Sequence, residues 1–346
     1  MIKVTIIGHF AKGKEKLNGQ TIKTKIIASE LERQYGKGAV KRVDTASGLR
    51  FLLLLPFIML NSLYVSKNIV IMPAHNGVRI IPPVLALMNI FFHRSLHYVV
   101  VGGWLDREVK ANVILRYALR HFSGIYPETR SMQQRLTALC LPNVIVMPNS
   151  KPLTIADIAL LPNDNQKPLR VCTFSRVMKE KGIEEAMHAV INCNKKKQKT
   201  VVTLDIYGQI EHGEEEWFED IKRYMPESVS YKGIVNYNDS VSILTGYSAL
   251  LFPTYYPGEC FAGTFLDAFA AGLPIIASDW HDNADIVTHG ETGFIFPVHD
   301  EKTLTDTLLS IIDNPSLLTD LRQACLLKAK EYQPQQIIKI LTSRLA

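Results

Sequence analysis

Residues 253–274 read PTYYPGECFAGTFLDAFAAGLP, and their pattern indicates the class of fold. A strand-like apolar run, Ala249–Pro253, leads into a loop that contains Pro and Gly, and a helical pattern begins at about Phe261. A strand followed by a short loop and a helix is the repeating unit of α/β folds with a parallel sheet. The stretch therefore predicts one such unit, with its loop at the carboxyl end of a strand, where open α/β sheets bind ligands.

Strand-like and helix-like segments alternate along the whole chain in the same way. The expected strands are continuously apolar, as in sheets whose two faces are both covered by helices. With 346 residues, the chain is also too long for one compact core. The pattern predicts an α/β protein with two doubly wound, Rossmann-like domains. The expected strands are Lys3–Ile7, Asn68–Met72, His97–Val101, Arg170–Ser175, Val201–Tyr207, Ala249–Pro253, Pro274–Ala277 and Gly293–Phe296, and the expected helices are Thr21–Gln34, Glu108–Leu119, Glu184–Cys193, Phe261–Ala271 and Leu304–Ile312.

The boundary between the domains is expected where Pro and Asn interrupt the pattern, in residues 148–168. We predict a first domain over 1–160 and a second domain over 161–330. Residues 331–346 are expected to form a C-terminal helix that packs back toward the first domain.

Composition restricts the class of protein. Hydrophobic residues make up 47% of the chain and charged residues 21%, which is typical of a folded soluble protein. The longest apolar run, Phe51–Leu60, is far shorter than the roughly 20 residues of a bilayer span. The five cysteines are scattered without metal-ligand spacing, so we interpret them as reduced thiols of a cytoplasmic protein.

Charge is distributed unevenly between the two halves of the chain. Residues 1–165 contain 21 Lys or Arg and 9 Asp or Glu, a balance of +12, whereas residues 166–346 contain 18 and 24, a balance of −6. No nucleic-acid-binding motif accompanies the basic half, so nucleic acid is not an expected partner. An anionic membrane surface or an anionic substrate is the favoured interpretation.

The decisive stretch also contains two carboxylates eight residues apart, Glu259 in the loop and Asp267 in the helix. The free N–H groups of a helix's first turn bind anions, and Gly263 permits close approach. Carboxylates nearby would accept hydrogen bonds from sugar or ribose hydroxyls. The alternative is a capped helix with an incidental Glu259 and an ordinary polar Asp267.

This motif resembles the E-x7-E region of the retaining glycosyltransferases of family 4, which have the GT-B fold, although Asp267 makes it E-x7-D here. It is most similar to members that synthesise bacterial surface polysaccharides, and the similarity extends to Ser278-Asp-Trp280. Two positions depart from the family pattern, Cys260, where Gly is usual, and Ala262, where Gly or Pro is usual.

The resemblance implies roles for particular residues. Glu259 would position hydroxyls of the donor sugar, and Asp267 would bind the ribose. Arg176 and Lys181, which follow the strand 170–174, would neutralise the leaving diphosphate. Without the resemblance, the favoured interpretation of Arg176 and Lys181 is a solvated, positively charged turn before a helix. The expected catalytic residues are Glu259, Arg176 and Lys181.

The expected donor-binding residues lie on several loops. The fold brings a glycine loop of the first domain to the donor phosphate, and we assign this part to Gly19. The nearby Lys12, Lys14 and Lys16 either engage an acceptor phosphate or belong to a mobile basic loop. The family's first-domain histidine has no counterpart in the loop after His97–Val101, which leaves that side of the mechanism open. The donor-binding set is Gly19, Gly208, Gly233, Val235, Phe261, Ala262, Gly263, Thr264 and Asp267.

The resemblance implies transfer, with retention, from a nucleotide-sugar donor to a saccharide acceptor linked to a lipid pyrophosphate. The expected pathways are capsule, exopolysaccharide or lipopolysaccharide synthesis. Neither a metal nor another cofactor is expected to be required. The expected location is the cytoplasm, with peripheral contact at the cytoplasmic face of the inner membrane. The alternatives are a GT-B-like sugar-nucleotide epimerase and a non-catalytic GT-B scaffold of a membrane assembly complex.

Two apolar segments of the first domain, Phe51–Val65 and Val84–Phe92, allow two interpretations. They are either buried helices that cover the sheet or an interfacial face of the kind that peripheral membrane enzymes present to lipid.

Overall fold

The computed structural model describes residues 2–11, 19–46, 49–73, 75–161 and 167–346. The chain folds into two units, Met1–Pro152 with Tyr332–Ala346, and Leu153–Glu331. The division follows Pro152, whereas the sequence led us to place it after residue 160. The backbone N–H of Ala156 donates to the carbonyl oxygen of Ala270 at 2.8 Å, which attaches the segment after Pro152 to the second unit.

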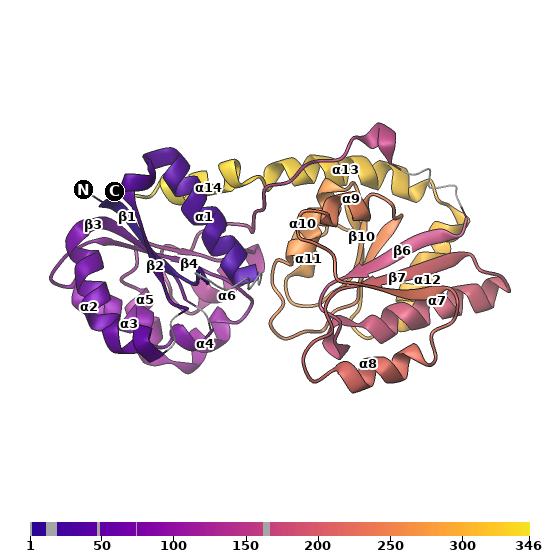
Figure 1. Ribbon diagram of the computed structural model, residues 1–346, viewed down its shortest axis with the longest axis horizontal. Helices are drawn as coiled ribbons and strands as arrows, with labels where there is room; N and C mark the ends of the chain where they lie inside the picture. Colours follow the sequence, from indigo (N-terminus) through magenta and orange to yellow (C-terminus); the bar gives the residue numbers. More distant parts are fainter. Residues whose placement is uncertain (1, 12–18, 47–48, 74, 162–166) are drawn as a thin grey trace. The chain divides into compact units, whose positions relative to one another are not determined.

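The N-terminal unit contains a five-stranded sheet in the order β2-β1-β3-β4-β5, and every neighbouring pair is parallel. Helix α1 covers one face, and α2 and α3 cover the other (Figure 1). The strands are β1 (Ile2–Gly8), β2 (Val40–Asp44), β3 (Ser66–Met72), β4 (Ser95–Val99) and β5 (Gly124–Tyr126). The helices are α1 (Gly19–Tyr35), α2 (Leu49–Val65), α3 (Ile81–Asn89), α4 (Leu105–Ala111), α5 (Val113–Leu119), α6 (Arg130–Ala138) and α14 (Pro334–Thr342), with short 3₁₀ turns η1 (Lys37–Ala39) and η2 (His75–Gly77).

The C-terminal unit contains a six-stranded parallel sheet in the order β11-β10-β9-β6-β7-β8. Its strands are β6 (Leu169–Phe174), β7 (Val202–Tyr207), β8 (Val229–Gly233), β9 (Ala249–Phe252), β10 (Ile275–Ser278) and β11 (Gly293–Phe296). Its helices are α7 (Ile183–Lys197), α8 (Glu215–Lys222), α9 (Ser240–Leu244), α10 (Gly263–Ala270), α11 (Asn283–Ile286), α12 (Glu301–Asp313) and α13 (Leu317–Glu331), with 3₁₀ turns η3 (Ile158–Leu160) and η4 (Lys179–Lys181).

The strand order of the C-terminal unit sets the position of a ligand site. Read from the β8 edge, the strands follow the doubly wound order 3-2-1-4-5-6, so the order reverses between β6 and β9. Ligands of open α/β sheets bind outside the carboxyl ends of the strands at such a reversal. The loops that follow β6 and β9 are therefore the expected place for a site.

The prediction of two doubly wound parallel sheets is confirmed, and several elements differ in detail. Residues 108–119, expected as one helix, belong to α4 and α5, because the Asn112 side chain accepts a hydrogen bond from the N–H of Leu115 at 3.0 Å and starts a new helix. Helix α10 begins at Gly263, two residues later than expected. Strands β2, β5 and β8 were not expected, and each is an edge strand.

The C-terminal helix α14 belongs to the N-terminal unit, where it packs against α1 (Figure 1). The chain end is held by Asn68 of β3. Its amide nitrogen donates to the carbonyl oxygen of Ala346 at 3.1 Å, and its amide oxygen accepts from the N–H of Ala346 at 2.8 Å. The last residues of the chain thus complete the packing around the first sheet.

The two apolar segments form α2 and α3, each with a buried inner side and exposed apolar residues on its outer side. Helix α2 buries Leu55, Met59 and Leu63 against the sheet, while Phe57 and Tyr64 on its outer side are 70% and 77% exposed. None of the helices in the described ranges combines the length and the apolar character that crossing a bilayer requires.

His97 of β4 is a buried titratable group in this unit. Its Nδ1 lies 3.0 Å from the hydroxyl oxygen of Tyr126, and its Nε2 has no hydrogen-bond partner in the described part of the chain. Burial away from water disfavours the charged imidazolium and lowers the pKa of His97 from 6.5 to about 4.

We expect His97 to make the free energy of unfolding depend on pH. Between pH 6.5 and 4, the unfolded chain takes up a proton on this imidazole and the folded protein does not, so stability falls as the pH falls. A shift of this size corresponds to about 3 kcal/mol in total. Urea unfolding of the wild type and of His97→Gln across this range measures it, with the exposed His121→Gln as the control. An unchanged pH slope in His97→Gln would contradict the expectation.

Candidate active site

The residues expected to be catalytic follow the two strands at the reversal of the C-terminal sheet. Arg176 and Lys181 come after β6, and Glu259 comes after β9. Strands β6 and β9 pair directly, with Val171 beside Ala249 and Cys172 beside Leu250. The sheet order thus carries two loops that are about eighty residues apart in sequence to the same edge.

Lys181 and Glu259 meet in a buried ion pair. The Lys181 Nζ donates a hydrogen bond to Glu259 Oε2, and both side chains are 8% exposed. The hydroxyl of Thr254 donates to the same carboxylate oxygen at 3.1 Å. A buried carboxylate is thus held in one orientation by two donors, beside a buried cation.

The loops that carry this pair are packed against each other through their backbones. The N–H of Tyr255 donates to the carbonyl oxygen of Glu180 at 2.8 Å. At Gly182, which has φ +71°, a Cβ atom would lie 2.2 Å from the carbonyl oxygen of Pro253. Glycine is therefore required there for the loop after β6 to approach the loop after β9 this closely.

Tyr256 connects the two basic residues of the site. The Arg176 guanidinium lies 5.2 Å and the Lys181 ammonium 4.9 Å from the centre of its ring. The Tyr256 carbonyl oxygen accepts hydrogen bonds from the N–H of Glu259 at 3.0 Å and from Trp280 Nε1 at 2.8 Å. Tyr256 was not among the predicted site residues, although an aromatic residue inside the Pro/Gly loop was a signal that could have indicated it.

Arg176 remains a cation at every ordinary pH and is partly open to solvent. It forms a 2.6 Å ion pair with Glu211, a residue that sequence analysis also missed. Burial acts to lower the pKa of Arg176, but hydrogen bonds to Tyr256 and Glu211 outweigh it and leave the pKa raised. Because the Arg176 side chain is 45% exposed, it can also reach an anion from this position.

The N-terminus of α10 offers free backbone donors close to Glu259 in sequence. The preceding residue, Ala262, supplies no side-chain cap, and the Gly263 position is exposed, with open space where a Cβ atom would be. The Thr264 hydroxyl oxygen is buried without a hydrogen-bond partner among the described residues. This helix end is suited to an anion. Phe261 and Ala262 precede the helix rather than opening it, and Phe261 is buried.

Asp267, Gly208 and Gly233 lie on the same unit. Asp267 is buried in α10. Tyr237 follows β8, two residues after Val235. The pKa of Tyr237 is raised, first by its own burial and second by the negative charge of Asp267. The N–H of Gly208 donates to the carbonyl oxygen of Gly233 at 2.9 Å, so the ends of β7 and β8 are joined.

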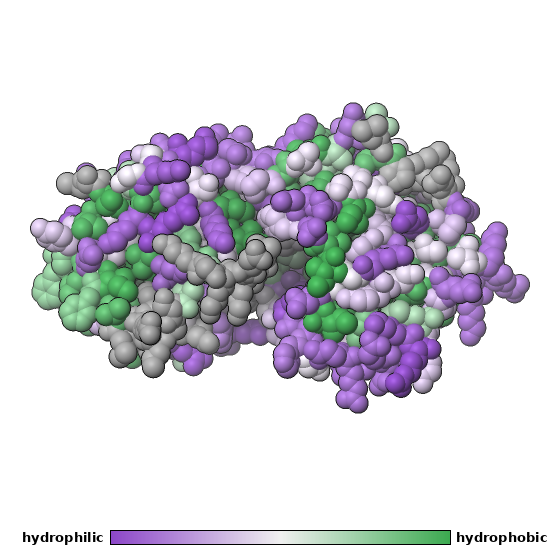
Figure 2. Space-filling model, viewed as in Figure 1, coloured by the Kyte–Doolittle hydropathy of each residue, from purple (hydrophilic) through white to green (hydrophobic). Residues whose placement is uncertain are grey.

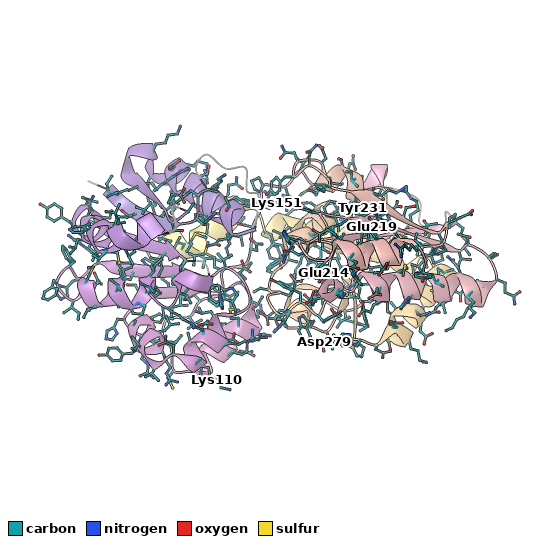
Figure 3. The ribbon with its side chains drawn as sticks, turned by 60° about the horizontal axis from the view of Figure 1, so that its bottom comes forward. Lys110, Lys151, Glu214, Glu219, Tyr231 and Asp279 are labelled. Atoms are coloured by element: carbon teal, nitrogen blue, oxygen red, sulfur yellow. The ribbon has the colours of Figure 1, made fainter. Side chains whose placement is uncertain are left out.

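Tyr231 of β8, labelled in Figure 3, supports the same junction. Its hydroxyl donates to the carbonyl oxygen of Gly208 at 2.8 Å. Gly208 is therefore held by backbone and side-chain bonds at the edge of the sheet that carries the site.

Gly19 belongs to the N-terminal unit, where it is the first residue of α1 and is exposed. Its expected part in donor binding stays a prediction. Lys12, Lys14 and Lys16 lie outside the described residues.

This arrangement supplies two cations, an open helix N-terminus and two buried carboxylates. Cations and helix N–H groups together bind phosphate groups. Oriented carboxylates accept hydrogen bonds from hydroxyls of a polyol. The unit is thus equipped for a ligand that combines phosphate with sugar.

Comparison with known proteins agrees with this conclusion. Residues 161–330 match the family described as "Glycosyl transferases group 1". The chain is 25% identical to a glycogen synthase of Mycobacterium tuberculosis over 225 residues, which cover 62% of this chain and 51% of that protein. It is 27% identical to the capsular polysaccharide biosynthesis glycosyltransferase CapM of Staphylococcus aureus over 142 residues, which cover 41% of this chain and 36% of CapM. The chain thus spans about half the length of the glycogen synthase (51%) and 36% of the length of CapM.

Among solved structures, HepE from Anabaena in complex with UDP is similar over 99% of both chains, with a TM-score of 0.76 and 14% identity. At 14% identity, this similarity is evidence for the fold alone. With the two parallel sheets described above, it confirms the predicted GT-B architecture.

Proposed function

We propose that the protein is a glycosyltransferase of polysaccharide biosynthesis, which moves a sugar from a nucleotide-sugar donor to a saccharide acceptor. The observation that carries this proposal is the arrangement of Lys181 and Arg176 around Tyr256, beside the buried carboxylate of Glu259. The family match of residues 161–330 and the similarity to CapM support it.

The donor diphosphate is bound by Arg176, Lys181 and the N–H groups at the start of α10. Glu259 orients hydroxyls of the donor sugar, and Asp267 accepts a hydrogen bond from the ribose. As the bond between the sugar and the diphosphate breaks, negative charge develops on the leaving oxygens, and these fixed positive groups stabilise it. No metal is required for this role in our proposal, because the charge is met by side chains and backbone.

The finer proposal is a retaining enzyme of family 4. The acceptor hydroxyl attacks the face of the sugar that the diphosphate leaves, and its proton passes to the departing diphosphate. The acceptor is a saccharide linked to a lipid pyrophosphate, at the cytoplasmic face of the inner membrane. The +12 balance of residues 1–165 supports an anionic acceptor.

We expect one class of nucleotide sugar to stabilise the protein in the presence of EDTA. Thermal unfolding with UDP-, GDP-, ADP- and dTDP-sugars measures this, with UDP-glucose tested first because HepE binds UDP. A donor at a hundred times its dissociation constant raises the free energy of unfolding by about 2.7 kcal/mol. The same donor should stabilise Arg176→Gln much less.

Product analysis then separates glycosyl transfer from the two alternatives. Transfer to an added saccharide supports the proposal. Conversion of the donor without any acceptor would indicate an epimerase, and stabilisation without turnover of any donor would indicate a scaffold. Absence of stabilisation by every nucleotide sugar would contradict the donor site itself.

A further inference from the structure

The outer sides of three neighbouring helices in the N-terminal unit are apolar and exposed. Helix α3 packs against both α2 and α5, so the three outer sides adjoin one another. Figure 2 shows hydrophobic residues gathered over α2 and α3. We call this surface the apolar face. Its exposed members are Leu54, Phe57, Leu60 and Tyr64 of α2, Leu87, Ile90 and Phe91 of α3 and the turn after it, and Val113, Ile114 and Tyr117 of α5.

These exposed side chains are distinct from the side chains that form the hydrophobic core. Each helix already buries a separate inner side, with Leu55, Met59 and Leu63 in α2, and Leu85 in α3. Helices on the surface of a globular protein normally carry charged or polar residues on the outer side. Residues 54–65 of α2 contain no charged residue at all, although Phe57 is 70% exposed. Exposed apolar surface of this extent marks an interaction site.

The segment that forms the apolar face is strongly basic. Residues 49–123 contain eight Lys or Arg and only two acidic residues, Asp106 and Glu108. Both acids are used in ion pairs, Asp106 with Arg135 at 2.6 Å and Glu108 with Arg79 at 2.6 Å. Within the described part of this segment, no acidic side chain is left without a cation.

Exposed cations lie along the same segment. Lys67 follows α2, Lys110 is near the end of α4, and Arg120 follows α5. Lys110 lies at the periphery of its unit, as labelled in Figure 3. Exposed cations thus lie in the same segment of the chain as the apolar residues, and both acidic residues of this segment are already paired with arginines.

We infer that the apolar face binds the surface of a bilayer that contains anionic lipids, with α2 and α3 lying in the plane of the interface. Apolar side chains that enter the acyl boundary, together with cations that meet lipid phosphates, are the two contributions that hold peripheral proteins at membranes. A second copy of the chain fits less well, because a symmetric contact through this face would bring the same cations against each other.

The inference rests on the exposed face and its charge, and it deepens the proposed function by locating the membrane contact of an enzyme that acts on a lipid-linked acceptor. It assigns no catalytic role to α2, α3 or α5. Failure of the inference and failure of the proposed transfer can therefore be distinguished.

Sedimentation of the full-length protein with vesicles tests the inference. Vesicles of phosphatidylcholine alone are compared with vesicles that also contain phosphatidylglycerol, at low and high salt. We expect binding to the anionic vesicles, weakened by salt. The triple variant Phe57→Ser/Leu87→Ser/Ile114→Ser should bind at least about tenfold more weakly. Each of Lys110→Gln and Arg120→Gln should weaken binding about fivefold at low salt.

The matched control is Tyr224→Ser/Leu327→Ser, which removes two exposed apolar side chains from the C-terminal unit and should bind like the wild type. Donor-induced thermal stabilisation reports separately on folding and on the donor site, and the triple variant should retain it. Failure of the wild type to bind anionic vesicles at low salt would overturn the inference, as would wild-type binding by the triple variant. A dimer that the triple variant abolishes, without vesicle binding, would assign the face to a second copy instead.

Discussion

Glu259→Gln is expected to lower the rate of glycosyl transfer by about 10²–10³-fold, the usual effect of removing one oriented electrostatic group from an active site. The substitution preserves the shape of the side chain but removes its charge. Glu259 Oε2 then no longer accepts strong hydrogen bonds from Lys181 and Thr254, so the orientation of the group toward the donor sugar is lost as well.

The same substitution should also destabilise the protein. Lys181 and Glu259 are both buried, so replacing one partner leaves the other charge without compensation. Breaking a buried ion pair in this way typically costs about 3–5 kcal/mol. Lys181→Met should cost a similar amount. The double variant Lys181→Met/Glu259→Gln should be more stable than the sum of the single effects predicts, because neither charge remains.

The two effects separate a catalytic pair from a structural one. Urea unfolding gives stability, and initial rates measured well below the unfolding temperature give transfer. We expect the double variant to recover stability without recovering transfer. The exposed pair Lys197–Asp313 is the control, since Asp313→Asn should change stability by no more than about 1 kcal/mol and leave transfer unchanged. Wild-type transfer by the double variant would remove Lys181 and Glu259 from the mechanism.

Gly208→Ala is expected to destabilise the protein by about 4 kcal/mol, from overpacking together with backbone strain. A Cβ atom at this position would lie 1.6 Å from the carbonyl oxygen of Ser175, and the residue has φ +140°. The backbone at the end of β7 would have to move away from Ser175, which follows β6 and directly precedes Arg176. Donor binding should therefore weaken together with stability.

Two other glycines separate the contributions. Gly213 also has a positive φ, +92°, but open space around it, so Gly213→Ala should show backbone strain alone, about 1 kcal/mol. Gly263 has open space and no positive φ, so Gly263→Ala should leave stability nearly unchanged. Chemical unfolding of the three variants gives the order directly. Equal losses in Gly208→Ala and Gly213→Ala would show that the close approach to Ser175 does not constrain the fold.

The three strands that were not predicted, β2, β5 and β8, all lie at sheet edges and lack a long apolar run. β2 reads VKRVD and β8 reads VSYKG, each with charged residues, and β5 is only three residues long. The central strands, which are buried on both faces, were found from their apolar runs.

The candidate site was predictable in part. Arg176, Lys181 and Glu259 each follow a strand of the sheet, and strand ends are visible in the local pattern. Tyr256 and Glu211 were missed, because their importance depends on which side chains from other loops reach them. Tyr256 matters through Arg176 and Lys181, which come from the loop after a different strand.

From the amino-acid sequence alone we could predict the alternation of strands and helices, the ligand-facing loops and the chemical types of the site residues. These properties follow from local patterns of apolar residues, Gly and Pro. The folded structure was needed to show that Lys181 pairs with Glu259, 78 residues further along the chain, and that both are buried. Their meeting depends on β6 lying beside β9, and strand order is set by the packing of the whole sheet, which local pattern does not encode.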